Sequence, residues 1–315
     1  MILEDRWLRE TYVDLLIEYA KKDDRLVIVE ADLMKAAGTT RFGNELPERT
    51  VNVGVQEANM IGVAAGMSAM GKIPFTHTFT PFATRRVCDQ VTLSVAYAGL
   101  NVKMMGSDPG VTAELNGGTH MSMEDVAIMR NIPNMIIYEP VDSAQLKKAF
   151  PQILEHYGPV YIRLLRRNAV QVFDDNCDFK LGKGVVLKSG KDVTVIASGI
   201  MVAEAIKAEK ALSEIGIDAE IINIHTIKPL DEELVLQSAR KTGAVVVAEN
   251  HSIINGLGSA VAECLSENYP VPLQRVGVKD HFGEVGFTEF LKGKYGLTDK
   301  EIILAAQKAI SMKRK

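Results

Sequence analysis

One carboxylate, Glu57, precedes a stretch of small and apolar residues that can be buried on nearly every side. The stretch reads "VGVQEANMIGVAAGMSAM" from Val53 to Met70. A carboxyl group held away from water at such a position can share a proton with a ring nitrogen of a bound molecule. The simpler interpretation is that Glu57 interacts with the dipole at the N-terminus of the helix that follows. The residues of this stretch leave both roles open.

Other residues able to do chemistry are predicted to lie at the ends of strands. In an open α/β sheet, ligands bind beside the carboxyl ends of the strands. The residues predicted at this edge are Glu57, Phe79, Phe82, Arg85, Arg86, Asn116, His120, Arg163, Arg166 and Arg167. A carboxylate, flat apolar side chains, a histidine in a Gly-rich loop and paired arginines suit a planar, nitrogen-bearing heteroaromatic ring. The arginines also suit a phosphorylated, hydroxylated substrate next to that ring.

Short apolar strands alternate with amphipathic helices along the chain, which is typical of parallel α/β sheets. The first helix is predicted from Leu8 to Tyr19, and the apolar segment 25–32 ("RLVIVEAD") follows as a buried strand. The alternation continues to about residue 165, stops over the polar segment 166–184 and then resumes. We predict two α/β domains, residues 1–166 and 185–315, each an open, mostly parallel sheet with flanking helices. The segment between them is expected to be a linker that crosses the surface.

The composition is that of an ordinary globular protein. The chain has 315 residues, 47% hydrophobic and 24% charged, with a net charge of −4. This charge argues against nucleic acid or an anionic membrane as a partner. The three cysteines are widely spaced and form no CxxC pair, which favours a reducing compartment and predicts no metal site. The N-terminus is charged throughout and resembles neither a signal peptide nor a membrane span, so we expect a cytoplasmic protein.

Six blocks of the sequence resemble successive blocks of transketolase, in the same order. They read "GVQEANMIGVAAGM", "TFTPFATRRVCDQ", "NGGTHMSMEDVAIMRNIPNM", "PVYIRLLRRN", "IHTIKPLDEE" and "GVKDHFGEVG". The resemblance covers nearly the whole chain. It implies a thiamine-pyrimidine-binding (Pyr) domain at residues 1–166 and a transketolase C-terminal domain at residues 185–315, that is, the thiamine-diphosphate-binding fold.

One part of the transketolase pattern is missing. Transketolases carry an N-terminal domain whose Gly-Asp-Gly motif holds Mg²⁺ and the cofactor diphosphate, and this chain contains no Gly-Asp-Gly. The resemblance therefore implies the C-terminal subunit of a split transketolase. We expect it to work with a separate N-terminal subunit that binds Mg²⁺ and the diphosphate, in an α₂β₂ assembly.

The resemblance also implies roles for the residues near the cofactor. Glu57 matches the family glutamate that hydrogen-bonds N1′ of the aminopyrimidine of thiamine diphosphate. Phe79 and Phe82 match the aromatic wall against which this ring stacks. Val55 is expected to line the same pocket, with core packing as the alternative. Arg85 occupies a position where many transketolases have another aromatic residue, so its guanidinium is a candidate for stacking on the cofactor.

Four further residues are predicted to bind substrate. Asn116 stands where the family has an aspartate that contacts a substrate hydroxyl, and Arg166 matches the family arginine that grips the substrate phosphate. Arg163 could reach the same phosphate only through a turn or bulge, because residues an odd number apart on a strand face opposite sides. Arg41, in a Gly-flanked loop, is a second candidate phosphate ligand, or an exposed loop arginine.

One histidine has a predicted catalytic role, and a second expected histidine is missing. His120 matches the histidine of the family's Gly-Pro-Thr-His loop, which contacts the donor near its reacting carbons. Where many transketolases have a histidine ahead of this loop, the chain reads "GSDPG", and Asp108 is the nearest candidate to replace it.

The expected activity is the transketolase reaction of the pentose phosphate pathway. A two-carbon ketol unit would pass from a ketose phosphate, such as xylulose 5-phosphate, to an aldose phosphate, such as ribose 5-phosphate. The alternatives are a 2-oxoacid dehydrogenase E1 β-like subunit and a split transketolase specialised for an unusual sugar. A catalytically silent scaffold is a further alternative, against which the intact set of site residues argues.

Overall fold

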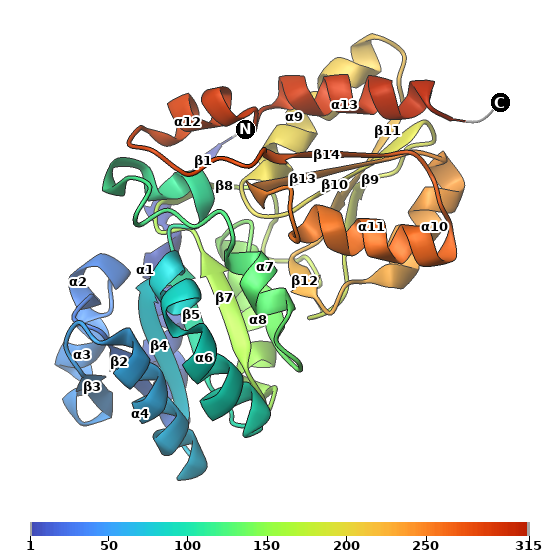
Figure 1. Ribbon diagram of the computed structural model, residues 1–315. Coiled ribbons are helices and arrows are strands. Elements are labelled where there is room, and N and C mark those ends of the chain that lie inside the picture. The colour runs from blue at the N-terminus through green and yellow to red at the C-terminus, as the bar shows by residue number, and fades with distance from the viewer. Residues whose placement is uncertain (1, 314–315) are drawn as a thin grey trace.

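The structure, a computed structural model, describes residues 2–313 and has two lobes (Figure 1). The blue-to-green half of the chain forms the lower lobe in this view, and the yellow-to-red half forms the upper lobe. Each lobe is built on its own mostly parallel sheet with helices packed against it. The predicted fold class, two open α/β sheets with flanking helices, is confirmed.

The sheet of the first lobe has seven strands in the order β12-β6-β7-β5-β4-β2-β3. All neighbouring pairs are parallel except β12 with β6. Four strands, β2, β4, β5 and β7, are buried along their whole length, as expected for a parallel sheet covered on both faces. The bounds are β2 Leu26–Glu30, β3 Thr50–Asn52, β4 Ile73–Phe79, β5 Lys103–Ser107, β6 Ile136–Tyr138, β7 Val160–Leu164 and β12 Thr226–Lys228.

Helices cover both faces of this sheet because alternate strand residues point to opposite sides. On β7, Ile162 packs with α1 and α8, whereas its neighbour Tyr161 packs in the cluster that includes α4 and the helices after Arg85. The helical bounds are α1 Leu8–Ala20, α2 Met34–Ala37, α3 Thr40–Glu45, η1 Pro47–Arg49, α4 Glu57–Ala69, α5 Thr80–Ala83, η2 Arg85–Val87, α6 Cys88–Gln90, η3 Val91–Tyr97, η4 Gly110–Asn116, α7 Asp125–Arg130 and α8 Ser143–Glu155. Of these, η3 is a π-helix, and η1, η2 and η4 are 3-10 helices.

The sheet of the second lobe has five strands in the order β14-β13-β10-β11-β9, with only β9 antiparallel to its neighbour. Helices α9 and α13 pack on one face, and α10 and α11 pack on the other. The bounds are β9 Val185–Lys188, β10 Val193–Ala197, β11 Ala219–Asn223, β13 Val245–Ser252, β14 Leu273–Val278, α9 Met201–Glu214, α10 Glu232–Thr242, α11 Leu257–Asn268, α12 Thr288–Tyr295 and α13 Asp299–Ser311. No helix within residues 2–313 combines the length and the apolar character that crossing a membrane needs.

Segment 166–184, predicted as a surface linker, is anchored at several points. Strand β8 (Asn168–Val170) pairs antiparallel with β1 (Leu3–Trp7) to form a separate two-stranded sheet. Two of its side chains, Phe173 and Phe179, are buried, with their ring centroids 4.7 Å apart. The polar composition of the segment hides these two aromatic anchors, which hold the connection against the second lobe.

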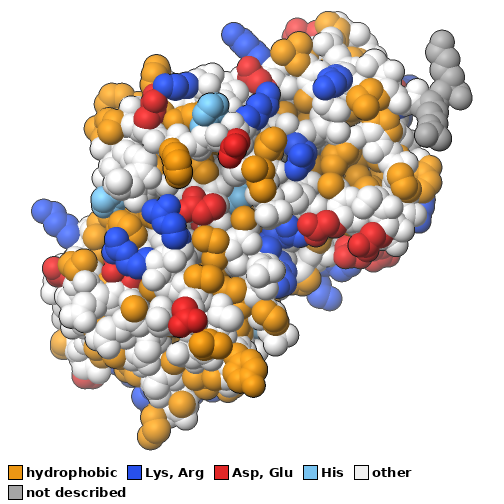
Figure 2. Space-filling view, in the orientation of Figure 1, with side chains coloured by type: hydrophobic (Ala, Val, Ile, Leu, Met, Phe, Trp, Pro, Cys, Tyr) orange, Lys and Arg blue, Asp and Glu red, His pale blue; other side chains and the backbone are white. Residues whose placement is uncertain are grey.

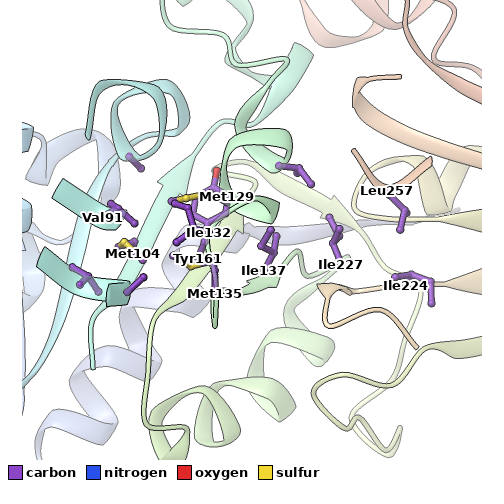
Figure 3. Close-up of a cluster of buried hydrophobic side chains, with 14 of the residues drawn as sticks. Val91, Met104, Met129, Ile132, Met135, Ile137, Tyr161, Ile224, Ile227 and Leu257 are labelled. Carbon is purple, nitrogen blue, oxygen red and sulfur yellow. The ribbon is translucent and has the colours of Figure 1, made fainter. Parts of the chain in front are cut away.

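Apolar packing is continuous from one lobe to the other. A single cluster of buried side chains includes Val91 and Met104 of the first lobe and Ile224 and Leu257 of the second. Figure 3 shows it passing through Ile137 and Ile227 in the middle. Strand β12, which carries Ile227, comes from the second half of the chain and completes the sheet of the first half. The two lobes are therefore packed against each other through a shared core.

A buried ion cluster lies at the same junction and is centred on Arg163 of β7. The guanidinium is 1% exposed and donates hydrogen bonds to the carboxylates of Asp125 and Glu139. It also donates to the backbone oxygen of Asn250, which belongs to β13 of the second lobe, at 2.7 Å. Arg163 was predicted to bind substrate phosphate, but its donors are directed to these acceptors inside the protein. The correction follows from strand alternation, because Arg163 faces the same side of β7 as Tyr161.

Replacing Arg163 with methionine should destabilise the protein strongly. The substitution leaves the carboxylates of Asp125 and Glu139 buried without their cation, which typically costs about 3–5 kcal/mol. Denaturant unfolding at fixed protein concentration measures the loss. Arg25→Met is the matched control, because Arg25 is exposed and its ion pair with Asp23 is worth about 1 kcal/mol or less. Equal stabilities for the two variants would contradict the central role of Arg163.

Candidate functional site

Glu57 is the first residue of α4. Strand β3 ends at Asn52, the chain turns at Gly54 with a φ of 76°, and the helix begins at Glu57. The carboxylate lies in the first turn, where the helix dipole favours a negative charge, and the residue is only 4% exposed. It accepts a hydrogen bond from Arg86 Nη1 at 2.7 Å. The favourable position near the helix dipole and the buried carboxylate at the sheet edge are thus both present.

An aromatic cluster lies at the end of β4. Phe79 is the last residue of the strand, and Phe82 follows in the short helix α5. His120, from the loop after η4, completes the cluster, with ring centroids 5.7 Å from Phe79 and 5.0 Å from Phe82. The rings meet edge to face, the arrangement that aromatic pairs favour. The structure therefore brings His120 to the two phenylalanines with which it was grouped from the sequence.

Arg86, not Arg85, joins Glu57 to the aromatic cluster. The guanidinium carbon of Arg86 lies 3.7 Å from the ring centroid of Phe82, while the same side chain pairs with Glu57. Arg85 instead pairs with Glu124 at 2.8 Å and is about half exposed. The prediction that Arg85 stacks on the cofactor is not matched by its position here. Arg85 and Arg86 are consecutive residues of the 3-10 helix η2, so their side chains point in different directions. The sequence did not indicate which of the two points toward Glu57.

The remaining cofactor and hydroxyl-binding candidates lie on the surface. Val55 is 69% exposed on the turn before α4, which excludes the alternative that it is a core residue. Asn116 is exposed at the last position of η4, four residues before His120. Both side chains are accessible to a ligand, and their predicted roles stay predictions.

A second, cationic pocket of about 440 Å³ lies beside the aromatic cluster. It is lined by Trp7, Arg9, Asp32, Leu33, Lys35, Ala36, Arg166 and Arg167. The guanidinium of Arg166 lies 5.9 Å from the ring of Phe79, so this arginine belongs to both parts of the site. Burial and the charge of Arg166 lower the pKa of Arg9, as expected where cations crowd together. On the face drawn in Figure 2, basic side chains lie beside the boundary between the lobes.

Arg9 was missed by the sequence reasoning. It belongs to α1, about 157 positions before Arg166, and only the packing of that helix brings the two together. The signal in the sequence was an arginine two residues after Trp7, over whose ring its guanidinium lies at 4.3 Å. Such a pair is common on protein surfaces, so it did not predict an anion site.

Two of the pocket's arginines are paired with carboxylates. Arg166 Nε lies 3.1 Å from Oδ2 of Asp108, and Arg167 pairs with Glu114 at 2.7 Å. Asp108 is fully buried, and burial raises its pKa to about 6 although the three arginines nearby oppose the shift. Asp108, the candidate to replace the missing family histidine, thus contacts an arginine of this pocket, and its role stays a prediction.

Two predicted phosphate ligands lie elsewhere. Arg163 is enclosed in the ion cluster of the domain junction, as described above. Arg41, on α3, pairs with Asp14 and lines a neighbouring pocket that shares only Arg9 and Lys35 with the cationic pocket. The structure therefore groups Arg9, Arg166 and Arg167, where the sequence grouped Arg41, Arg163 and Arg166.

Comparison with known proteins identifies the family. Residues 6–171 match the model of the transketolase pyrimidine binding domain, and residues 182–302 match that of the transketolase C-terminal domain. The chain belongs to the transketolase family. It is 69% identical over 311 residues to a 6-deoxy-6-sulfo-D-fructose transketolase subunit of Clostridium sp. (strain MSTE9), a match that covers 99% of this chain and 97% of that protein.

Two other transketolase relatives match over almost the full length. A putative transketolase C-terminal section from Methanocaldococcus jannaschii is 43% identical over 298 residues, covering 94% of this chain and 93% of the relative. A solved structure described as a split gene transketolase, inactive β4 tetramer, matches with a TM-score of 0.90 at 45% identity, covering 98% and 99% of the two chains. The chain thus corresponds to the two C-terminal domains of transketolase.

The pyrimidine-binding domain of this transketolase chain contains every residue of the site. The aromatic cluster, Glu57 and the cationic pocket all lie within the matched residues 6–171. A buried carboxylate beside flat aromatic faces fits an aminopyrimidine, since the carboxylate can bond a ring nitrogen while the ring stacks. The residues present therefore fit the pyrimidine end of thiamine diphosphate.

Arg9→Met should weaken binding of an oxyanion to the cationic pocket. Inorganic sulfate is the probe, and its affinity is expected to fall by about tenfold because a charge-assisted hydrogen bond is lost. The sulfate-dependent rise in melting temperature of the chain measures the effect. Arg6→Met is the matched control, because Arg6 is exposed, lies outside this pocket and pairs with Asp14. A full sulfate response in Arg9→Met would contradict the assignment of the pocket.

Proposed function

We propose that this chain is the C-terminal subunit of a split transketolase that acts on a sugar with a terminal sulfonate. The observation that carries the proposal is the adjacency of two sites on one chain. Glu57, Phe82 and His120 suit an aminopyrimidine, and the arginines of the cationic pocket suit the charged end of a sugar. The reaction is transfer of a two-carbon ketol unit from a ketose to an aldose, in which the C2–C3 bond of the donor breaks.

Glu57 holds the pyrimidine end of the cofactor in this proposal. Within residues 2–313, only its Oε1 has a hydrogen-bond partner, Arg86, so the second oxygen can bond the ring nitrogen N1′. Phe79 and Phe82 provide the stacking surface. Thiamine diphosphate supplies the electron sink for the broken carbon–carbon bond, and the protein positions and polarises it.

His120 acts on the substrate at the boundary of the two sites. Its ring lies against both phenylalanines, and its Nδ1 lies 2.9 Å from Oγ1 of Thr119, so Nε2 is the nitrogen available to a ligand. An imidazole there can hydrogen-bond a substrate hydroxyl or move its proton as the carbon–carbon bond breaks.

The donor sugar is proposed to be 6-deoxy-6-sulfo-D-fructose. The 69% identical relative from Clostridium sp. is a transketolase subunit for this sugar, which supports the alternative of an unusual sugar over xylulose 5-phosphate. A sulfonate is a tetrahedral oxyanion that arginines can bind as they bind phosphate. The acceptor is proposed to be an aldose phosphate. The 2-oxoacid dehydrogenase alternative loses support, since a branched-chain oxoacid has no terminal anion for the cationic pocket.

A separate N-terminal subunit is proposed to complete the cofactor site. The chain has no Gly-Asp-Gly motif for Mg²⁺ and diphosphate, and the solved relative carries the description of a split gene transketolase whose β4 tetramer is inactive. Helix α4 presents Gly62 and Gly66 to open space, and a close approach of another chain there is sterically allowed. We propose an α₂β₂ assembly with Mg²⁺ bound mainly by the partner.

The isolated chain should show no ketol transfer, and addition of the N-terminal subunit should restore it. The reason is that the diphosphate and Mg²⁺ ligands are supplied by the partner. Turnover of 6-deoxy-6-sulfo-D-fructose with an aldose phosphate acceptor is measured with each chain alone and with the mixture. Turnover by this chain alone would refute the split arrangement, and turnover of xylulose 5-phosphate but not the sulfosugar would refute the proposed donor.

Glu57→Gln should reduce kcat of the reconstituted enzyme by about 10²–10⁴-fold, the usual contribution of a proton-transferring group. The glutamine keeps the size of the side chain but cannot exchange a proton with the ring nitrogen. Binding of thiamine diphosphate, followed by calorimetry, should be weakened far less than turnover. Glu18→Gln, an exposed acid on α1, is the control. Unchanged kcat in Glu57→Gln would remove Glu57 from the mechanism.

A further inference from the structure

The cationic pocket carries less net charge than its arginines suggest. Four cationic side chains line it, namely Arg9, Lys35, Arg166 and Arg167. Against them stand three carboxylates, namely Asp32 in the lining, Asp108 beside Arg166 and Glu114 beside Arg167. The pocket therefore has an excess of one positive charge, which matches a singly charged ligand.

We propose that the carboxylates of Asp108 and Glu114 make this pocket selective for a terminal sulfonate over a terminal phosphate. The inference rests on the proposed function and names the residues that set its substrate preference. A sulfonate carries one negative charge at any working pH, whereas a phosphate ester carries close to two above its second pKa of about 6. Fixed negative charges behind the arginines repel the second charge, so they penalise phosphate more than sulfonate.

Among the described residues, the carboxylate of Asp108 is buried without hydrogen bonds that would stabilise it there. It is fully buried, and neither carboxylate oxygen has a hydrogen-bond partner within residues 2–313. Its only ion-pair partner there is Arg166, at 3.1 Å. Burying a carboxylate without hydrogen bonds is unfavourable, so the arrangement is a poor stabilising device. Its main effect is to place a buried negative charge against an arginine that lines the pocket.

Glu114 is the carboxylate that pairs with Arg167. Its Oε2 pairs with Arg167 at 2.7 Å, while Oε1 accepts hydrogen bonds from the backbone and hydroxyl of Thr288 in the second lobe. The side chain is 10% exposed. Arg9, by contrast, has no carboxylate within ion-pair distance among the described residues, since its hydrogen bond goes to the backbone of Ala36. Arg9 and Lys35 are thus the two lining cations that no carboxylate pairs with among the described residues.

Asp108→Asn tests the proposal with little disturbance of the backbone. Asp108 has a φ of 57°, and asparagine is among the non-glycine residues that adopt this conformation most readily. The test uses the complex reconstituted from this chain and the N-terminal subunit at pH 8, where phosphate is doubly charged. The two donors, 6-deoxy-6-sulfo-D-fructose and D-fructose 6-phosphate, differ only at the terminal anion.

The measured quantity is the ratio of kcat/KM for the sulfonate donor to kcat/KM for the phosphate donor. Asp108→Asn should lower this ratio by about tenfold or more, because one unit charge a few ångströms away in a partly buried site has an effect of this size. Glu114→Gln should change it in the same direction. Asp24→Asn, which removes the same charge from an exposed turn before β2, should leave it unchanged.

Competitive inhibition gives a readout that does not depend on turnover of either donor. Glycerol 3-phosphate and 2,3-dihydroxypropane-1-sulfonate share a carbon chain and differ in charge. The ratio of their inhibition constants should shift toward the phosphate compound in both variants. Melting temperatures of the variants show whether each protein is folded, and the second variant remains informative if the first is not.

The outcomes separate the inference from the proposed function. A wild-type complex that prefers fructose 6-phosphate would overturn the proposed sulfosugar substrate. A ratio that stays within twofold of the wild-type value in folded Asp108→Asn and Glu114→Gln complexes would overturn the charge-selection inference, whichever donor the wild type prefers.

Discussion

The hydrogen bonds of Arg163 fix the place where the two domains meet, and the position of the loop that carries Asp108 depends on this contact between the domains. The guanidinium bonds Asp125, where α7 begins after the His120 loop, and the backbone of Asn250 in the second domain. The side chain of Asn250 in turn donates to the backbone oxygen of Pro109 and accepts from the amide of Val111. The loop that carries Asp108 is therefore held by the second domain, through contacts that a single buried arginine organises. This gives the C-terminal domain a structural role in the site, although every site side chain comes from the first domain.

The fold could be predicted because its signals are local. Buried parallel strands give short apolar runs, helices give apolar residues at helical spacing, and their alternation specifies an α/β sheet. Strand β12 was not predicted, because its three residues, Thr226–Lys228, pair only with the edge strand β6 of the other domain. The burial of Phe173 and Phe179 was likewise hidden in a polar segment. In both cases the decisive contact is between segments far apart in the sequence.

The site could be predicted in its types of residue but not in all its members. Family resemblance placed Glu57, Phe79, Phe82 and His120, and the structure brings them together. It could not choose between adjacent arginines, since Arg85 and Arg86 differ only in the direction that a turn of 3-10 helix gives them. Arg9 was beyond reach, because only the docking of α1 against the sheet brings it to Arg166.

Arginines at the end of β7 show how burial and hydrogen bonding separate structure from function. Arg163, on the strand, donates hydrogen bonds to buried acceptors, and its charge is compensated by carboxylates inside the protein. Arg166, three residues later, has passed the end of the strand and meets a carboxylate, that of Asp108, which has no hydrogen bond from the described residues. The guanidinium of Arg163 is hydrogen-bonded to three acceptors inside the protein. The Nε of Arg166 has no hydrogen-bond partner among the described residues, so this guanidinium retains the capacity to bind an anion from outside. The same residue type therefore stabilises the domain junction when it lies on β7 and suits recognition of an anion just beyond the end of that strand, and the hydrogen bonding of its partners decides which.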